Sequence, residues 1–346
     1  MFSPSSPAST SSASTLKQNS KKTFALPLIA ALPLAAVVAC SSSEEASQQP
    51  SSSETATNKQ AQWPRTVTVG DNDVTVQSQP KRIVALSTEV ADLALELVGP
   101  ERVVAVTKNA LDESSGNQVE LARKVPNAIA NSTKPDPEQI LSYEPDMVLM
   151  TSRHDQEQSA SKLLGASDVP TAAFSSSDFA SPKALAESVT TLGKLLGAEE
   201  KAAEMVAKIE SETEEILSGI DSTTKPKTLV LFARGGQKMI MGTQSATTNL
   251  VELAGGEPIS PKGKRPGAVP ADPETIVQLN PDVILIQDFH GQGKAPFQEL
   301  LDNPALADVA AVKNDRVHLI DAKTTSGTAG MHMPDGLREI ADALAK

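Results

Sequence analysis

The pattern of apolar and polar residues contains one stretch that occurs twice. The first copy runs from Asp136 to Leu149, and the second begins 136 residues later and runs from Asp272 to Leu285. Seven of the fourteen positions are identical, and most others exchange one apolar residue for another. Asp, Pro and Glu at the start of each copy predict a capped helix, and the apolar run after the second Pro predicts a buried strand. This long-period duplication predicts two similar α/β lobes.

Shorter apolar runs predict further strands around the two copies. They lie at residues 67–69, 74–76, 83–86, 103–106, 169–173, 228–232, 239–241 and 316–320. The first two flank Gly70-Asp71-Asn72-Asp73, which is typical of a hairpin. Helices are expected over residues 88–98, 246–254, 296–301 and 333–345.

The longest amphipathic segment lies between the two copies. From Ser181 to Ile216, apolar residues recur at helical spacing. Gly193 and Gly197 interrupt this pattern and are expected to bend or break the helix. The sequence therefore predicts an α/β protein with two Rossmann-like lobes, at residues 63–180 and 225–346, joined by a helical segment at 181–224.

The N-terminal region has the features of an export signal. Three lysines precede a 16-residue apolar run that is short for a transmembrane helix and ends directly before Cys40, the only cysteine. Small residues before Cys40 and serines after it resemble a bacterial lipobox, although Val37 replaces the commoner Leu. Residues 1–39 are expected to be a lipoprotein signal peptide and Cys40 a lipidation site, with an ordinary signal sequence as the alternative. The polar residues 40–62 predict a disordered tether.

The charge balance restricts the partners of this chain. Its formal net charge is −12, and loss of residues 1–39, which hold three Lys and no acid, would make it −15. Such a surface disfavours nucleic acid and anionic membrane surfaces as partners.

Several motifs together resemble a known family. They are the lipobox, residues 80–86 (PKRIVAL), both Pro-Asp-strand units, residues 302–306 (DNPAL) and residues 311–317 (AVKNDRV). In order and spacing, over about residues 64–346, the chain resembles the substrate-binding proteins of ABC importers for iron-siderophores, haem and cobalamin. The resemblance implies two α/β lobes joined by one long rigid helix, with ligand in the cleft between them and little hinge closure. It also implies a monomeric, lipid-anchored extracytoplasmic protein that delivers its ligand to a permease dimer.

The resemblance further implies how the protein docks. Members of this family contact the permease through one Glu on each lobe, near the start of the repeated helix. The matching residues here are Glu138 and Glu274. The alternative is that each acid only stabilises its helix, which is worth about 0.3–1 kcal/mol.

Ligand-binding residues are expected at the carboxyl ends of the parallel strands. His154 and His290 follow the Pro-Asp pair of their copies by the same eight residues, and either could ligate iron directly or be a solvated loop residue. Arg153 and Arg234 end strands in opposite lobes and suit an anionic ligand, unless each is paired with a neighbouring acid. Five further residues are weaker candidates or core residues: Lys264 and Arg265 could add charge, His332 could line the cleft, and Tyr143 and His318 are expected to be structural.

These residues favour an anionic ferric siderophore as the transported ligand. Haem is the alternative, although residues 129–133 lack the Tyr or His that haem-binding relatives commonly carry there. One Trp and one Tyr are few aromatic residues for the flat corrin of cobalamin. No permanently bound cofactor is expected. The chain lacks a Gly-rich phosphate loop, a nucleophile elbow and metalloprotease spacing, so it is not expected to be an enzyme. A surface lipoprotein that has lost transport is a further alternative.

Overall fold

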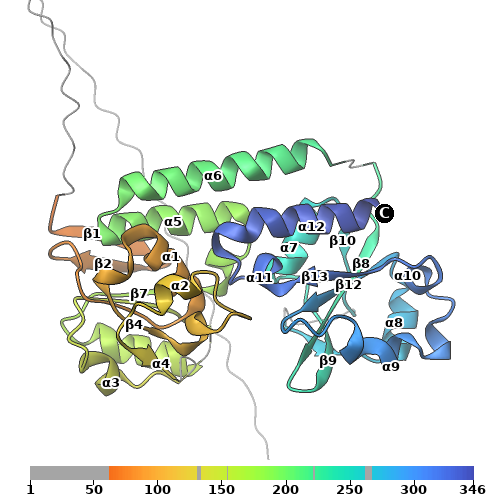
Figure 1. Ribbon diagram of the computed structural model, residues 1–346, viewed down its shortest axis with the longest axis horizontal. Coiled ribbons are helices and arrows are strands. Elements are labelled where there is room, and N and C mark those ends of the chain that lie inside the picture. Colours follow the sequence, from red (N-terminus) through yellow and green to blue (C-terminus); the bar gives the residue numbers. More distant parts are fainter. Residues whose placement is uncertain (1–61, 131–133, 154, 221–222, 262–266) are drawn as a thin grey trace, which may run out of the picture. The chain divides into compact units, whose positions relative to one another are not determined.

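The computed structural model describes residues 62–130, 134–153, 155–220, 223–261 and 267–346, which lie in one compact unit that begins at Lys59. Figure 1 shows the larger sheets flanked by helices. The strands are β1 (Arg65–Val69), β2 (Asn72–Val76), β3 (Ile83–Ala85), β4 (Val103–Thr107), β5 (Ala128–Ile129), β6 (Met147–Thr151), β7 (Thr171–Phe174), β8 (Lys227–Arg234), β9 (Gln237–Ile240), β10 (Glu257–Pro258), β11 (Val269–Pro270), β12 (Val283–Asp288) and β13 (Val317–Asp321). The α-helices are α1 (Thr88–Val98), α2 (Val119–Ala122), α3 (Pro137–Leu141), α4 (Asp155–Gly165), α5 (Pro182–Leu196), α6 (Glu199–Ser218), α7 (Ala246–Leu253), α8 (Pro273–Leu279), α9 (Gln298–Leu301), α10 (Ala310–Lys313), α11 (Ala322–Thr325) and α12 (Met333–Ala345).

Each lobe contains one large sheet. The first has the strand order β5-β4-β3-β6-β7, and all its pairs are parallel. The second has the order β11-β9-β8-β12-β13, with β10 also beside β8. There β8, β10, β12 and β13 run parallel, whereas β9 and β11 join by antiparallel pairs. The expected hairpin forms β1 and β2, a separate two-stranded sheet. No helix among the described residues is long and apolar enough to span a bilayer.

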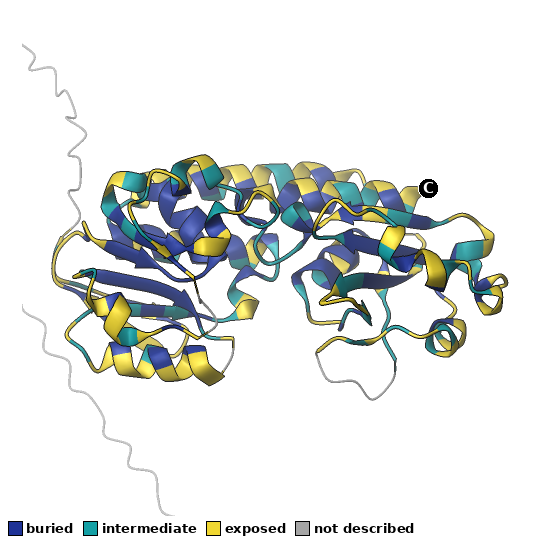
Figure 2. Cartoon of the chain, turned by 60° about the horizontal axis from the view of Figure 1, so that its bottom comes forward, coloured by how far each residue is buried: buried dark blue, intermediate teal, exposed yellow. Residues whose placement is uncertain are grey.

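Strand residues alternate between two helical layers, as a sheet buried on both faces requires. In β6, Met147 and Leu149 belong to the core on the α1 and α5 side, whereas Val148 and Met150 belong to the core that includes Ile140 of α3. The equivalent residues of β12 divide between two cores in the same way. Figure 2 shows the buried strands between helices that are exposed on their outer faces.

The two copies of the repeat fold as predicted. Asp136 caps α3 by accepting a hydrogen bond from the Glu138 N–H at 3.0 Å, and Asp272 caps α8 by accepting one from the Thr275 N–H at 2.9 Å. Proline occupies the first helical position in both. Each helix ends before the second proline of its copy, and a buried strand follows.

The aspartate after that proline aligns two strands. The Asp146 carboxylate accepts hydrogen bonds from the Lys81 and Arg82 N–H groups at 2.8 and 2.9 Å, directly before β3. The Asp282 carboxylate accepts one from the Lys227 N–H at 2.9 Å, at the start of β8. The repeat therefore specifies strand register as well as a helix and a strand.

The helical segment between the lobes consists of two helices. Gly197 ends α5 in the left-handed conformation with φ of 63°, and α6 begins two residues later. The α6 helix packs against α5 and also against α12 of the second lobe, so α6 alone continues from one lobe to the other. The Gly197 carbonyl accepts a hydrogen bond from Gln79 Nε2 at 3.1 Å, which ties the junction to the first lobe.

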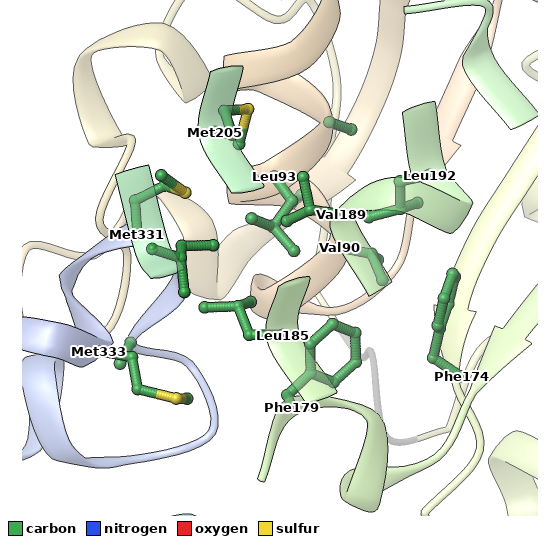
Figure 3. Packing of buried hydrophobic residues seen from close by; sticks show 14 of the residues in the cluster. Val90, Leu93, Phe174, Phe179, Leu185, Val189, Leu192, Met205, Met331 and Met333 are labelled. Atoms are coloured by element: carbon green, nitrogen blue, oxygen red, sulfur yellow. The ribbon is translucent and has the colours of Figure 1, made fainter. Parts of the chain in front are cut away.

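One of the apolar cores, the one on the α1 and α5 side of the first sheet, contains residues from both lobes. It contains Leu185 of α5 and Met205 of α6 together with Met331 and Met333 from the second lobe. In Figure 3 Leu185 lies between the two methionines and Phe179. Separating the lobes would expose this core to water, at a cost of about 25 cal/mol for each Å² of apolar surface.

We predict that Gly197→Ala destabilises the protein by roughly 1–2 kcal/mol or more, because an L-residue is strained in the left-handed conformation. The added Cβ would also lie 2.9 Å from the Trp63 ring and 3.1 Å from Gln79 Nε2. Urea unfolding followed by circular dichroism measures the loss. Gly165→Ala is the control, since its Cβ would meet no atom within 4 Å. Equal stability of the two variants would contradict the account.

Candidate functional site

The predicted ligand residues that the structure describes lie at the ends of parallel strands or in the loops that follow them. In the first lobe β6 ends at Thr151, and Arg153 follows two residues later. In the second lobe β8 ends at Arg234, β12 ends at Asp288, and His290 follows two residues later. Because β12 pairs with both β8 and β13, the loops after these three strands are neighbours.

A hollow of about 720 Å³ opens beside the loops after β8 and β12. Its lining includes Arg234, Lys238, His290 and Gln292, and we call it the basic hollow. Lys238 Nζ lies 2.8 Å from an oxygen of Glu299, and this hydrogen bond and charge hold the pKa of Glu299 below its ordinary value. Arg234 forms no ion pair within the described ranges, so its charge is available to a ligand.

A second hollow of about 530 Å³ shares His290 with the basic hollow and has walls from both lobes. Glu113, which pairs with Arg123, comes from the first lobe, and Asp288, Asp321, Glu339 and Lys323 come from the second. Because its acids outnumber its one lysine, we call it the acidic hollow. Burial raises the pKa of Glu339, although the Asp321 N–H opposes this shift by donating to its carboxylate at 3.1 Å. The two hollows meet at His290 and form one recess. Basic residues line one part of this recess, and mainly acidic residues line the other.

Asp288 fixes the loop that carries His290. Its oxygens accept hydrogen bonds from the N–H groups of His290, Gln292 and Gly293 at 3.1, 3.0 and 2.7 Å. Partial burial raises the pKa of Asp288, but these N–H groups outweigh it and hold the pKa below its ordinary value. The Phe289 ring centroid lies 6.4 Å from that of His290, whose side chain remains exposed.

Arg153 forms ion pairs with two buried acids. Its Nη1 lies 2.8 Å from Glu89 Oε1, its Nη2 lies 4.0 Å from Glu157 Oε1, and its backbone N–H donates to Glu157 Oε2 at 2.6 Å. Glu89 and Glu157 are only 5% and 2% exposed. Ser87 Oγ, Thr151 Oγ1 and Glu89 Oε2 are also buried, without hydrogen-bond partners in the described part of the chain. The first-lobe arginine is therefore largely neutralised by its surroundings.

The structure brings together two of the predicted ligand residues. Arg234 and His290 line the same hollow, whereas Arg153 lines neither hollow. Four residues named from the sequence lie outside the described residues: Cys40, His154, Lys264 and Arg265.

The remaining histidines and the tyrosine line neither hollow. Tyr143 is half-buried against the core on the α3 side of the first sheet, as expected. His318 lies within β13, where burial and nearby cations lower its pKa. His332 Nδ1 lies 3.1 Å from Asp335 Oδ2. Within the described ranges, no three His, Cys, Asp or Glu side chains gather as a metal site.

Lys238, Gln292 and Glu339 were missed by the sequence reasoning. A signal existed for Gln292, which lies two residues after His290 in the same loop. Lys238 enters the hollow because Gly235 and Gly236, both at positive φ, turn β8 back into β9. Glu339 is on α12, far along the chain, and only the packing of α12 against β13 and α11 brings it to the recess.

A buried aspartate binds the segment that follows Glu113 and Ser114, the first-lobe residues of the acidic hollow. Asp92 of α1 accepts hydrogen bonds from the Asn117 and Gln118 N–H groups at 2.8 and 3.1 Å. The Asn117 side chain donates in turn to the carbonyls of Thr328 and Ala329 in the second lobe, at 2.9 and 3.2 Å. Burial raises the pKa of Asp92 to about 6, although the two N–H groups lower it.

Comparison with known proteins agrees with this architecture. The family described as "Periplasmic binding protein" matches residues 83–324. The chain belongs to this family. The expected family and the two-lobed α/β fold are thereby confirmed, and the family is one of solute-binding proteins.

Three relatives illustrate the family. The chain is 27% identical over 321 residues to the uncharacterized ABC transporter substrate-binding lipoprotein YvrC of Bacillus subtilis, covering 91% of this chain and 95% of YvrC. It is 26% identical over 259 residues to the ferric-anguibactin-binding protein FatB of Vibrio anguillarum, covering 71% and 76%. The periplasmic heme-binding protein RhuT from Roseiflexus sp. RS-1 superposes with a TM-score of 0.59 at 23% identity, covering 76% and 97%, which shows a shared fold.

We predict that the free energy of unfolding of the wild type falls as the pH rises from about 4 to about 7.5, and that Asp92→Asn abolishes this fall. Because the native pKa of about 6 exceeds the ordinary 3.8, the native state binds more protons than the unfolded state between these values. Wild-type stability should therefore rise by roughly 3 kcal/mol relative to the variant when the pH falls from about 7.5 to about 4.

Urea unfolding at a series of pH values measures this difference. Asp342→Asn changes an exposed acid and should follow the wild-type profile. A constant difference between wild type and Asp92→Asn across the series would contradict the prediction.

Proposed function

We propose that this periplasmic binding protein captures an anionic iron chelate, a ferric siderophore, outside the cytoplasm and delivers it to an ABC importer. The observation that carries the proposal is the basic hollow, where Arg234, Lys238 and His290 converge in a protein of net charge −12. Its volume is in the range of small-molecule sites. FatB, a relative over most of the chain, is named for binding ferric anguibactin.

The chemistry of the basic hollow suits catecholate or carboxylate oxygens. A guanidinium donates two parallel hydrogen bonds to such oxygens, and Arg234 has no competing acid in the described part of the chain. Lys238 pairs with Glu299, whose side chain is exposed. Arg153 is a weaker candidate contact, because Glu89 and Glu157 already oppose its charge.

Haem is the second candidate ligand. The exposed imidazole of His290 borders both hollows, beside Phe289 and the apolar Leu319. Such an imidazole can ligate haem iron, and the apolar residues suit a porphyrin face. His154, the second expected iron ligand, lies outside the described residues, and its role stays a proposal.

The proposal also includes the anchor and the partner. Lipidation at Cys40 would hold the monomeric protein at the outer face of the membrane through the tether at residues 40–62. Glu138 and Glu274 would contact a permease dimer, one from each lobe. Both carboxylates are exposed, follow a capping aspartate, and form no ion pair among the described residues.

We predict that Arg234→Gln weakens binding of a ferric tris-catecholate by roughly 10- to 100-fold, because one charge-assisted contact is lost. Calorimetric titration measures the change. Arg338→Gln, which removes a surface arginine paired with Glu215, should bind like wild type. Equal affinity of the Arg234 variant and wild type would contradict the siderophore proposal. Binding of haemin with a Soret shift that His290→Ala abolishes would favour haem instead.

We predict that Glu138→Gln combined with Glu274→Gln abolishes uptake of the chelate while its affinity for the protein is unchanged. Two carboxylates at fixed separation would lose their pairing with cationic sites on the permease. Uptake of radio-iron by cells that produce each variant as the only copy measures the effect. The paired control is Glu210→Gln with Glu252→Gln, at exposed positions of α6 and α7. Normal uptake with the first pair would refute docking through these glutamates.

A further inference from the structure

Two exposed aliphatic side chains occupy the same position in the two copies of the repeat. Six large apolar residues are exposed in the described part of the chain: Leu141, Leu163, Leu217, Leu253, Val277 and Leu319. Of these, only Leu141 and Val277 lie within the repeat, and each is the sixth residue of its copy. They are 36% and 42% exposed.

Helix geometry explains why these residues face outward. Ile140 and Ile276, one position earlier, are fully buried and fix the inward face of α3 and α8. The next residue is turned by about 100° and so points away from the core. Leu141 lies three residues after Glu138, and Val277 three residues after Glu274. Residues at this spacing share one helix face, so each lobe displays a carboxylate beside an aliphatic group.

The neighbouring polar residues of the repeat differ in chemistry between the copies, whereas the glutamate and the aliphatic residue are kept. The residue after each glutamate differs between copies, Gln139 against Thr275, and so does the residue after each aliphatic position, Ser142 against Gln278. The glutamate is identical in both copies, and the exposed position stays aliphatic. Isolated exposed apolar residues are ordinary on protein surfaces, but a matched pair on two lobes indicates a shared use.

We propose that Leu141 and Val277 are docking residues that insert into two equivalent apolar recesses of the permease dimer, each beside the cationic group that pairs with Glu138 or Glu274. This inference rests on the proposed function and extends it from charge pairing to apolar burial. The glutamate gives register and attraction at a distance, whereas the buried aliphatic group slows dissociation. A partner with two equivalent subunits fits, because the two patches are chemically equivalent.

The test is binding of the full lipidated protein to the importer that takes up the labelled chelate, reconstituted in nanodiscs. Leu141→Gln with Val277→Gln should weaken this complex by on the order of tenfold for each substitution, since each removes the burial of one aliphatic group. Affinity for the ferric tris-catecholate should be unchanged.

The matched control is Leu163→Gln with Leu217→Gln, which alters two exposed leucines outside the repeat. These variants should bind the importer like wild type. All four changes are at exposed positions, and thermal unfolding should confirm a wild-type fold.

The outcomes separate this inference from the docking proposal. If the Leu141 and Val277 pair binds normally while the Glu138 and Glu274 pair does not, docking by the glutamates stands and the apolar contact is refuted. If neither pair affects binding, the docking proposal itself fails. If the control pair weakens binding equally, the effect is not specific to the repeat and the inference is overturned.

Discussion

The continuous apolar core is the constraint on which the rest of the structure depends. It joins α1 of the first lobe, through the interlobe helices α5 and α6, to η6 (Gly330–His332) and α12 of the second. Hydrogen bonds from Asn117 to second-lobe carbonyls lie at the edge of this core and are held in turn by Asp92. Residues from both lobes can therefore build one recess, because their elements share a core as well as a linker.

The charges around the recess are arranged unevenly. Arg234 of the second lobe forms no ion pair in the described ranges, whereas Arg153 of the first lobe, which lines neither hollow, is held by Glu89 and Glu157. An anionic chelate would therefore gain most of its charge-assisted contacts from the second lobe. The acidic hollow next to it disfavours anionic groups and suits hydrogen-bond donors, so it would orient a chelate that carries both.

The repeat made much of the fold predictable. Capping aspartates, first-turn prolines and apolar runs are local signals, and they identified α3, α8, β6 and β12 together with the two-lobe architecture. The helix α4 was not predicted, because its sequence is mostly polar and only Ala160, Leu164 and Glu157 are buried.

The site was less predictable, because its chemistry depends on contacts between distant segments. His290 and Arg234 could be found, since both directly follow predicted strands. The neutralisation of Arg153 could not be predicted, because Glu89 lies 64 residues earlier, on α1. The same holds for Glu339, which is brought to the recess only by the packing of α12.

The central claim is that the second lobe provides the charge that holds an anionic iron chelate. Anomalous diffraction at the iron edge, from crystals grown with a ferric tris-catecholate, tests it most directly. The account predicts one iron peak in the basic hollow, with chelate oxygens within hydrogen-bond distance of Arg234. A peak beside Arg153, or no ordered iron in either hollow at saturating chelate, would contradict it.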